Sequence, residues 1–120
     1  MPNTIPSAEQ LKAKLLQIYK CREPFELLVF DRLPKTRMGV YIVHSKRIRV
    51  YSRWSFACPL IEIAIHEYAH HIHLTENYEG DIRGRDRSHG EKFWRIFSAL
   101  MAEAKRQGIF DDELIHNIIR

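Results

Sequence analysis

One segment, IEIAIHEYAHHIHLT at residues 61–75, restricts the fold of this chain more than any other part of its sequence. Apolar residues cover most sides of this segment, a pattern typical of a helix at the centre of a domain rather than on its surface. His66, Glu67 and His70 interrupt the apolar pattern. Burying two imidazoles and a carboxylate is costly unless they share a partner. We therefore expect a domain built around this helix, with the three polar side chains bound to a common partner.

The spacing HExxH indicates that this partner is a metal ion. Residues four apart lie one turn above each other on one helix face, so His66 and His70 can present two ring nitrogens to one ion. Two neutral imidazoles leave the charge of Zn²⁺ uncancelled, and this charge lowers the pKa of a bound water to about 7. Glu67 would stand beside that water and is expected to act as its general base. The alternative, solvated histidines on an exposed helix, fits the apolar surroundings less well.

A catalytic zinc site usually has three protein ligands, so a third must come from outside HExxH. We favour His89, because Ser88 and Glu91 form a capping box that predicts a helix start and places His89 in the first turn. The positive end of a helix also disfavours a charged imidazolium, which keeps His89 able to ligate. Glu91 remains the alternative ligand, since its separation from HExxH also fits a zinc site.

Other side chains near HExxH fit a shared metal site less well. His73 shares the face of His66 but lies about 10 Å from it along the helix, too far for one ion. His71 is expected to point away from this face. The weakest candidates are His44, Glu76 and Glu79. Because positions 73 and 76 hold histidine and glutamate, the chain also lacks the longer metzincin motif.

The sequence before the zinc helix predicts one helix and three strands. A capping box at Ser7 and Gln10 begins a helix that continues to about residue 20. Strands are expected at residues 25–30, 38–44 and 47–52, the first of them buried and the last two joined by a tight turn. Trp54 and Phe56 follow in a loop, where we expect them to lie in the core or in the wall of a cleft.

The zinc helix is expected at residues 59–75 and is followed by further helices. Residues 76–87 predict a polar loop near the mouth of the site. A helix from Ser88 to Gly108 and a short helix that begins at Asp111 complete the order α-β-β-β-α-α-α. We therefore predict an α+β fold, in which a short antiparallel or mixed three-stranded sheet packs on the zinc helix.

Composition limits the class of protein. At 45% hydrophobic, the 120 residues can bury a core, and we expect a single domain over residues 1–120. No stretch approaches the ~20 apolar residues of a membrane span, and the first residues do not form a signal peptide. We therefore expect a cytoplasmic protein without a membrane partner. The sequence leaves the oligomeric state open, and we favour a monomer. Cys21 and Cys58 are too isolated for a zinc ribbon or a disulfide framework, so free thiols are expected.

The excess positive charge is concentrated in residues 31–53, where lysines and arginines greatly outnumber the single acid, Asp31. Two interpretations remain open. The cations can protect an exposed sheet edge against aggregation. Alternatively, Lys46, Arg47 and Arg49 can face a polyanion such as DNA. The net charge of +4 is too small to decide between them.

Two motifs give the chain a family resemblance. HEYAHHIH and the later RSHGEKFW resemble the SprT-like zinc metallopeptidase domain, the family that includes the Spartan proteases. The HGxxF segment of that family is matched by His89, Gly90 and Phe93, and the resemblance covers roughly residues 38–104. It implies a small zincin-type domain in which His66, His70 and His89 bind the metal. It further implies that Glu67 is the catalytic acid and base, and that the substrates are proteins, in several members proteins held on DNA.

Two hypotheses about function follow. The first is a zinc-dependent metalloendopeptidase that cleaves proteins, including flexible or DNA-associated ones, through a metal-activated water with Glu67 as general base. The second is a zinc-stabilised DNA-associated binding module without proteolytic activity.

For the enzyme, the sequence also suggests how a substrate would be held. We expect residues 47–52 to form an exposed sheet edge, with Val50 donating its N–H to an extended peptide. Tyr68, Tyr78 and the arginines of residues 76–87 are the candidate donors to the substrate oxyanion. Nothing in their spacing selects one of them.

Overall fold

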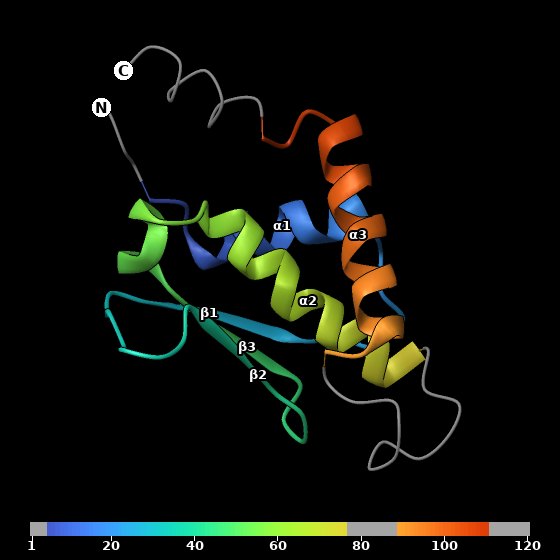
Figure 1. Cartoon of the computed structure of the whole chain (residues 1–120), viewed down its shortest axis with the longest axis horizontal. Helices are drawn as coiled ribbons and strands as arrows, with labels where there is room; N and C mark the ends of the chain where they lie inside the picture. The colour runs from blue at the N-terminus through green and yellow to red at the C-terminus, as the bar shows by residue number, and fades with distance from the viewer. Residues whose placement is uncertain (1–4, 77–88, 111–120) are drawn as a thin grey trace.

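The computed structural model describes residues 5–76 and 89–110, and its elements follow the order helix, three strands, helix, helix (Figure 1). Helix α1 is followed by the strands and by a short 3-10 helix, η1, which leads into α2 and then α3. Their bounds are α1 Ala8–Ile18, β1 Glu26–Phe30, β2 Gly39–Ile42, β3 Arg47–Tyr51, η1 Ser52–Phe56, α2 Leu60–Glu76 and α3 Glu91–Arg106. These residues form a small α+β domain with a mixed three-stranded sheet, as predicted. The short helix expected from Asp111 and most of the expected polar loop lie outside the described residues.

Helix α1 begins at the predicted capping box. The Oγ of Ser7 accepts a hydrogen bond from the backbone N–H of Gln10 at 3.1 Å, and the Gln10 side chain accepts one from the Ser7 N–H at 2.8 Å. These two bonds satisfy backbone groups that a helix start leaves free. Leu11 and Leu15, one turn apart, are fully buried, so the apolar stripe of α1 faces the core.

The sheet has the strand order β1-β3-β2, so β3 is its central strand. Val50 of β3 stands opposite Val29 in the parallel pair and opposite Gly39 in the antiparallel pair. The prediction that residues 47–52 form an exposed edge is therefore wrong. Ile48 and Val50 are both fully buried, which suits a central strand better than an edge. The edge strand beside α2 is β2.

Strand β1 is only half buried, which corrects the expectation of a buried strand. Leu27 is buried, whereas its neighbour Leu28 is 38% exposed. Figure 1 shows the helices on one side of the sheet, so alternate residues of each strand face away from them. The apolar run predicted that both faces of β1 are covered, but only the face toward the helices is buried.

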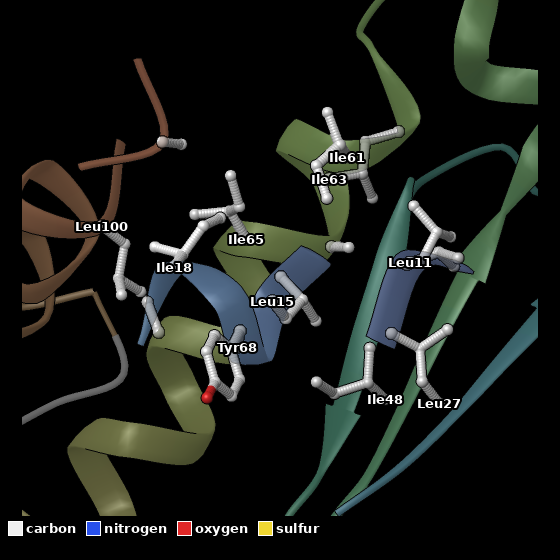
Figure 2. Packing of buried hydrophobic residues seen from close by; sticks show 14 of the residues in the cluster. Leu11, Leu15, Ile18, Leu27, Ile48, Ile61, Ile63, Ile65, Tyr68 and Leu100 are labelled. Atoms are coloured by element: carbon white, nitrogen blue, oxygen red, sulfur yellow. The ribbon is translucent and has the colours of Figure 1, made fainter. Parts of the chain in front are cut away.

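Helix α2 is the central helix of the domain, as its apolar sequence predicts, and packs on the sheet beside α1. It contacts β2 and β3 on one side and α1 and α3 on others. Figure 2 shows side chains from α1, β1, β3 and α3 meeting those of α2. The residues of α2 that are fully buried are Ala64, Ile65, Tyr68, Ala69, His71 and His73. Burial of this kind stabilises by ~25 cal/mol per Å² of apolar surface, so α2 holds the domain together.

The segment between β3 and α2 differs from its expected form. Residues 52–56 form the 3-10 helix η1 rather than a loop. Trp54 packs against the core and donates its indole N–H to the carbonyl of Pro34 at 3.0 Å. Phe56 is 76% exposed and stacks on Trp54, so the expectation that it lies in the core or a cleft wall is wrong. Helix α2 begins at Leu60, one residue after the predicted start at Pro59.

No helix of residues 5–76 or 89–110 combines the length and the apolar character needed to cross a membrane. The thiols of Cys21 and Cys58 are half-buried and are not joined in a disulfide.

Candidate metal centre

Helix α2 presents His66 and His70 on one face, as their four-residue spacing requires. His70 is 8% exposed and His66 is half-buried, and their ring centroids are 5.2 Å apart. Ile65 and Ala69, which precede them in the sequence, are fully buried in the core. The apolar face of α2 therefore holds the helix in place and leaves the histidine face toward a cavity.

His89 reaches the same place from the segment before α3. The Nε2 of His89 lies 3.2 Å from the Nε2 of His70. Helix α3 begins at Glu91 with Gly90 as its N-cap, so His89 precedes the helix instead of occupying its first turn as predicted. Gly90 has extended backbone and makes no side-chain cap, which excludes the expected helix start at Ser88. Ser88 itself lies outside the described residues.

The separation of these nitrogens matches a bound metal ion. Zinc–nitrogen bonds of about 2.0–2.1 Å at tetrahedral angles place two ligand nitrogens about 3.4 Å apart. The ligand atoms of His66, His70 and His89 all lie within 4.8 Å of one another. Only small side-chain rotations would bring all three to bonding distance. The three histidines predicted from the sequence are thus close enough to bind a metal ion.

The charge state of the cluster also suits a metal. Burial, with the neighbouring charges of His66, His89 and His73, lowers the pKa of His70 to about 3. Burial likewise lowers the pKa of His89, and His66 adds to this effect. Histidines with lowered pKa are neutral near pH 7, and only a neutral imidazole has a lone pair for a metal.

Glu67 lies beside the histidines and is 6% exposed. Its Oε2 is 3.1 Å from the Nδ1 of His66, where an Nδ1–H can donate to the carboxylate. That tautomer leaves the Nε2 of His66 unprotonated and available to a metal. A carboxylate that holds a ligating imidazole in this way also fixes its orientation.

Among the described residues, the alternative third ligands do not join the cluster. Glu91 is exposed and pairs with Arg95 at 3.4 Å, one turn further along α3. Glu76 accepts a hydrogen bond from the backbone N–H of Arg22 at 2.7 Å. His44 is exposed in the turn between β2 and β3. Glu79 lies outside the described residues.

His71 points away from the cluster, as predicted, and joins three parts of the chain. Its Nε2 lies 2.8 Å from the carbonyl oxygen of Glu23, which can only accept, so Nε2 carries the proton. Its Nδ1 then accepts from the hydroxyl of Tyr41 at 2.8 Å. Burial raises the pKa of Tyr41 to about 12 and lowers the pKa of His71. This pair fixes the position of β2 along α2.

Two residues that shape the centre were not assigned a role from the sequence. The ring of Phe93 is fully buried and stacks on His70, with centroids 4.2 Å apart, and lies 5.0 Å from the rings of His66 and His89. Phe93 thus packs against all three imidazoles. Gly39 is the second: a Cβ there would lie 3.2 Å from the Cγ of Glu67. Its lack of a side chain lets β2 approach the site.

Tyr68 is not available as an oxyanion donor, which corrects that prediction. It is fully buried on the core side of α2 (Figure 2). Its hydroxyl donates to the carbonyl of Tyr19 and accepts from the backbone N–H of Cys21 at 3.2 Å. The other candidates, Tyr78 and the arginines of residues 76–87, lie outside the described residues.

The cluster opens into a cavity of about 580 Å³ between α2 and the edge strand β2. His66, Glu67, His70 and His89 line it on one side. Strand β2 forms the opposite wall through Gly39, Val40 and Tyr41. The cavity thus brings together the candidate metal ligands, a carboxylate and the edge strand of the described sheet.

Comparisons with known proteins did not assign the chain to a family. Neither a scan against protein-family models, nor a search of curated proteins, nor a search of solved structures found a match.

Proposed function

We propose that this protein is a zinc-dependent metallopeptidase with a zincin-type site, in which His66, His70 and His89 hold the ion. The observation that carries the proposal is the convergence of three imidazoles from two segments, with Glu67 beside them, on one cavity. Three neutral nitrogen ligands with a fourth position open to a cavity are typical of catalytic zinc. The resemblance of both histidine motifs to the SprT-like domain supports the same function.

In this proposal Glu67 is the proton carrier. Bound zinc would supply a Lewis acid that polarises the substrate carbonyl and makes water more acidic. The Glu67 carboxylate accepts a proton from the attacking water and then delivers it to the leaving amide nitrogen. Its low exposure keeps bulk water from competing for this proton.

The substrate would pair with β2 rather than with the central strand β3. Strand β2 has β3 on one side, and Gly39, Val40 and Tyr41 border the cavity on the other. An extended peptide can add to such an edge through backbone hydrogen bonds alone. Flexible or unfolded segments are therefore the expected substrates, because a folded loop must unfold locally before it can pair.

Replacing Glu67 with glutamine tests the proposal. Glu67→Gln keeps the size of the side chain but cannot accept the proton, so casein cleavage should fall about 100- to 10,000-fold. Zinc content, measured by atomic emission, should remain that of the parent because the histidines are unchanged. Glu91→Gln is the matched control, since Glu91 is exposed on α3 and outside the cluster. Cleavage by Glu67→Gln at the parental rate would refute the role of Glu67.

The alternative of a DNA-associated module has less support. Several cations of residues 31–53 are paired with acids within the chain: Lys46 with Glu23 at 3.0 Å, Arg47 with Glu26 at 2.9 Å and Arg53 with Asp31 at 2.9 Å. Less positive charge is thus free for a polyanion than the sequence indicates. DNA binding at low salt that weakens steeply with added salt would favour the alternative.

A further inference from the structure

One acidic side chain of the cavity has no partner in the described residues. Glu62 stands one helical turn before His66 on the same face of α2 and lines the cavity. It is half-buried, and within residues 5–76 and 89–110 its carboxylate makes no hydrogen bond or ion pair. Glu67, by contrast, is paired with His66 in the same cavity.

The position of Glu62 in the fold explains why the charge is tolerated but not why it faces the cavity. Glu62 lies in the first turn of α2, where the positive end of the helix favours an acid. A fully solvated carboxylate would gain the same benefit. Turned into the cavity, it loses part of its hydration without gaining a partner among residues 5–76 and 89–110. A cationic group on a bound molecule would supply that partner.

The direction of β2 determines which part of a peptide would reach Glu62. Gly39 lies against Ile63 and Glu67, and two residues later Tyr41 contacts His71. Strand β2 therefore runs in the same direction as α2. A peptide paired antiparallel to β2, the more stable arrangement, must run from the His71 end toward the Glu62 end. The residues that follow the cleaved bond then lie beside Glu62.

The distances fit a side chain close to the bond. Four helical residues separate Glu62 from His66, a rise of about 6 Å, and an extended peptide advances about 3.3 Å per residue. Glu62 thus lies beside the first or second residue after the bond. Met38 and Ile63 also line the cavity and offer apolar contact to the stem of a long cationic side chain.

We infer that Glu62 selects substrates with lysine or arginine at the first or second position after the cleaved bond. The inference rests on the proposed peptidase function. Arg37 is the other charged side chain of the wall around β2; it is exposed and makes no ion pair with Glu62. It therefore leaves the carboxylate free for a substrate cation.

Peptide binding to a protein that cannot turn over tests the inference without relying on activity. The zinc-loaded Glu67→Gln protein is titrated with fluorescent peptides that differ only in lysine, norleucine or glutamate at each position around the bond, and anisotropy is recorded. We expect lysine after the bond to bind about fivefold more tightly than norleucine, the strength of a partly exposed ion pair. Adding Glu62→Gln should remove this preference, and adding Glu62→Lys should transfer it to glutamate.

Controls separate this inference from the proposed function. Adding Glu91→Gln should leave the lysine preference intact, and zinc content should be equal in all variants. A lysine preference that survives Glu62→Gln, or that appears only before the bond, overturns the inference while cleavage by the parent protein still supports a peptidase. If the parent cleaves no peptide and the Glu67→Gln protein binds none, the proposed function fails and this inference fails with it.

Discussion

The behaviour of the candidate centre depends on individual imidazoles. His70 is the most buried of the three, and its pKa of about 3 means that protons compete weakly with a metal for its ring. His89 is the most exposed of the three histidines and lies outside regular secondary structure. Its ring is held instead by stacking on Trp94, with centroids 5.8 Å apart, and by contact with Phe93.

Loss of His89 should therefore weaken metal binding without unfolding the domain. In His89→Ala we expect zinc affinity to fall more than about 100-fold. Mutating even a group that only hydrogen-bonds to a metal ligand lowers metal affinity about 10- to 100-fold, and loss of a ligand should cost more. Competition with a chromophoric chelator measures this change. His44→Ala, an exposed histidine of the β2–β3 turn, is the control and should bind as the parent does. Equal affinities for both variants would exclude His89 as a ligand.

At this scale the sequence predicted which histidines come together better than it predicted their surroundings. His66 and His70 follow from local helical spacing, and His89 from a short motif. Tyr68 was wrongly included among the candidate oxyanion donors, because the spacing of HExxH does not show which neighbouring positions face the core. The contacts of Phe93 with the imidazoles depend on how α3 packs on α2, which local sequence does not encode.

Among the elements, the contact between β2 and α2 matters most for the site. A Cβ on Gly39 would lie 3.0 Å from both the Arg49 carbonyl oxygen and the Cγ2 of Ile63, and 3.2 Å from Glu67. The Arg49 carbonyl belongs to the backbone of β3 and cannot turn aside. A side chain at position 39 must therefore push β2 away from α2 or displace Glu67.

Gly39→Ala should consequently damage both stability and catalysis. Overpacking of this kind costs ~1–3 kcal/mol of unfolding free energy, which the urea midpoint reports. We also expect kcat to fall while zinc content stays that of the parent, because the added methyl group lies against Glu67 and the three histidines are unchanged. An unchanged midpoint together with unchanged kcat would show that the strand does not approach α2 this closely.

The elements themselves were largely predictable, but the strand order was not. An apolar run located β1 and apolar alternation located β3, and all three strands were predicted to within a few residues. The turn at residues 43–46 made β2 and β3 neighbours. Whether β1 joins the side of β2 or of β3 depends on the connection through residues 31–38, which has no periodic pattern. The error placed the free edge on β3 instead of β2.

For the whole molecule, tyrosine hydroxyls connect α2 to the segments around it. Tyr68 reaches Tyr19 and Cys21 after α1, and Tyr41 reaches His71 from β2. The hydrogen bond to Glu76 raises the pKa of Tyr19, and burial raises the pKa of Tyr41 and of Tyr68. All three phenols therefore hold their protons more tightly in the folded protein than in the unfolded chain.

Stability should accordingly decline at alkaline pH. A folded-state pKa raised above the unfolded value of about 10 gives stability that is fully present below pH 10 and lost as pH rises toward the folded pKa. For Tyr41 this window runs from about 10 to about 12. Urea midpoints measured from pH 8 to 11 should fall less steeply for Tyr41→Phe than for the parent. Identical slopes would show that Tyr41 does not titrate with folding.

The central claim, that three histidines hold a zinc ion with one position open, is tested most directly by zinc K-edge X-ray absorption. The spectrum of the stoichiometrically loaded protein should fit three imidazole nitrogens and one oxygen at about 2.0–2.1 Å. In His89→Ala the imidazole contribution should fall to two. Absence of stoichiometric zinc, a sulfur ligand from Cys58 or Cys21, or a closed site with a fourth protein ligand would contradict the claim.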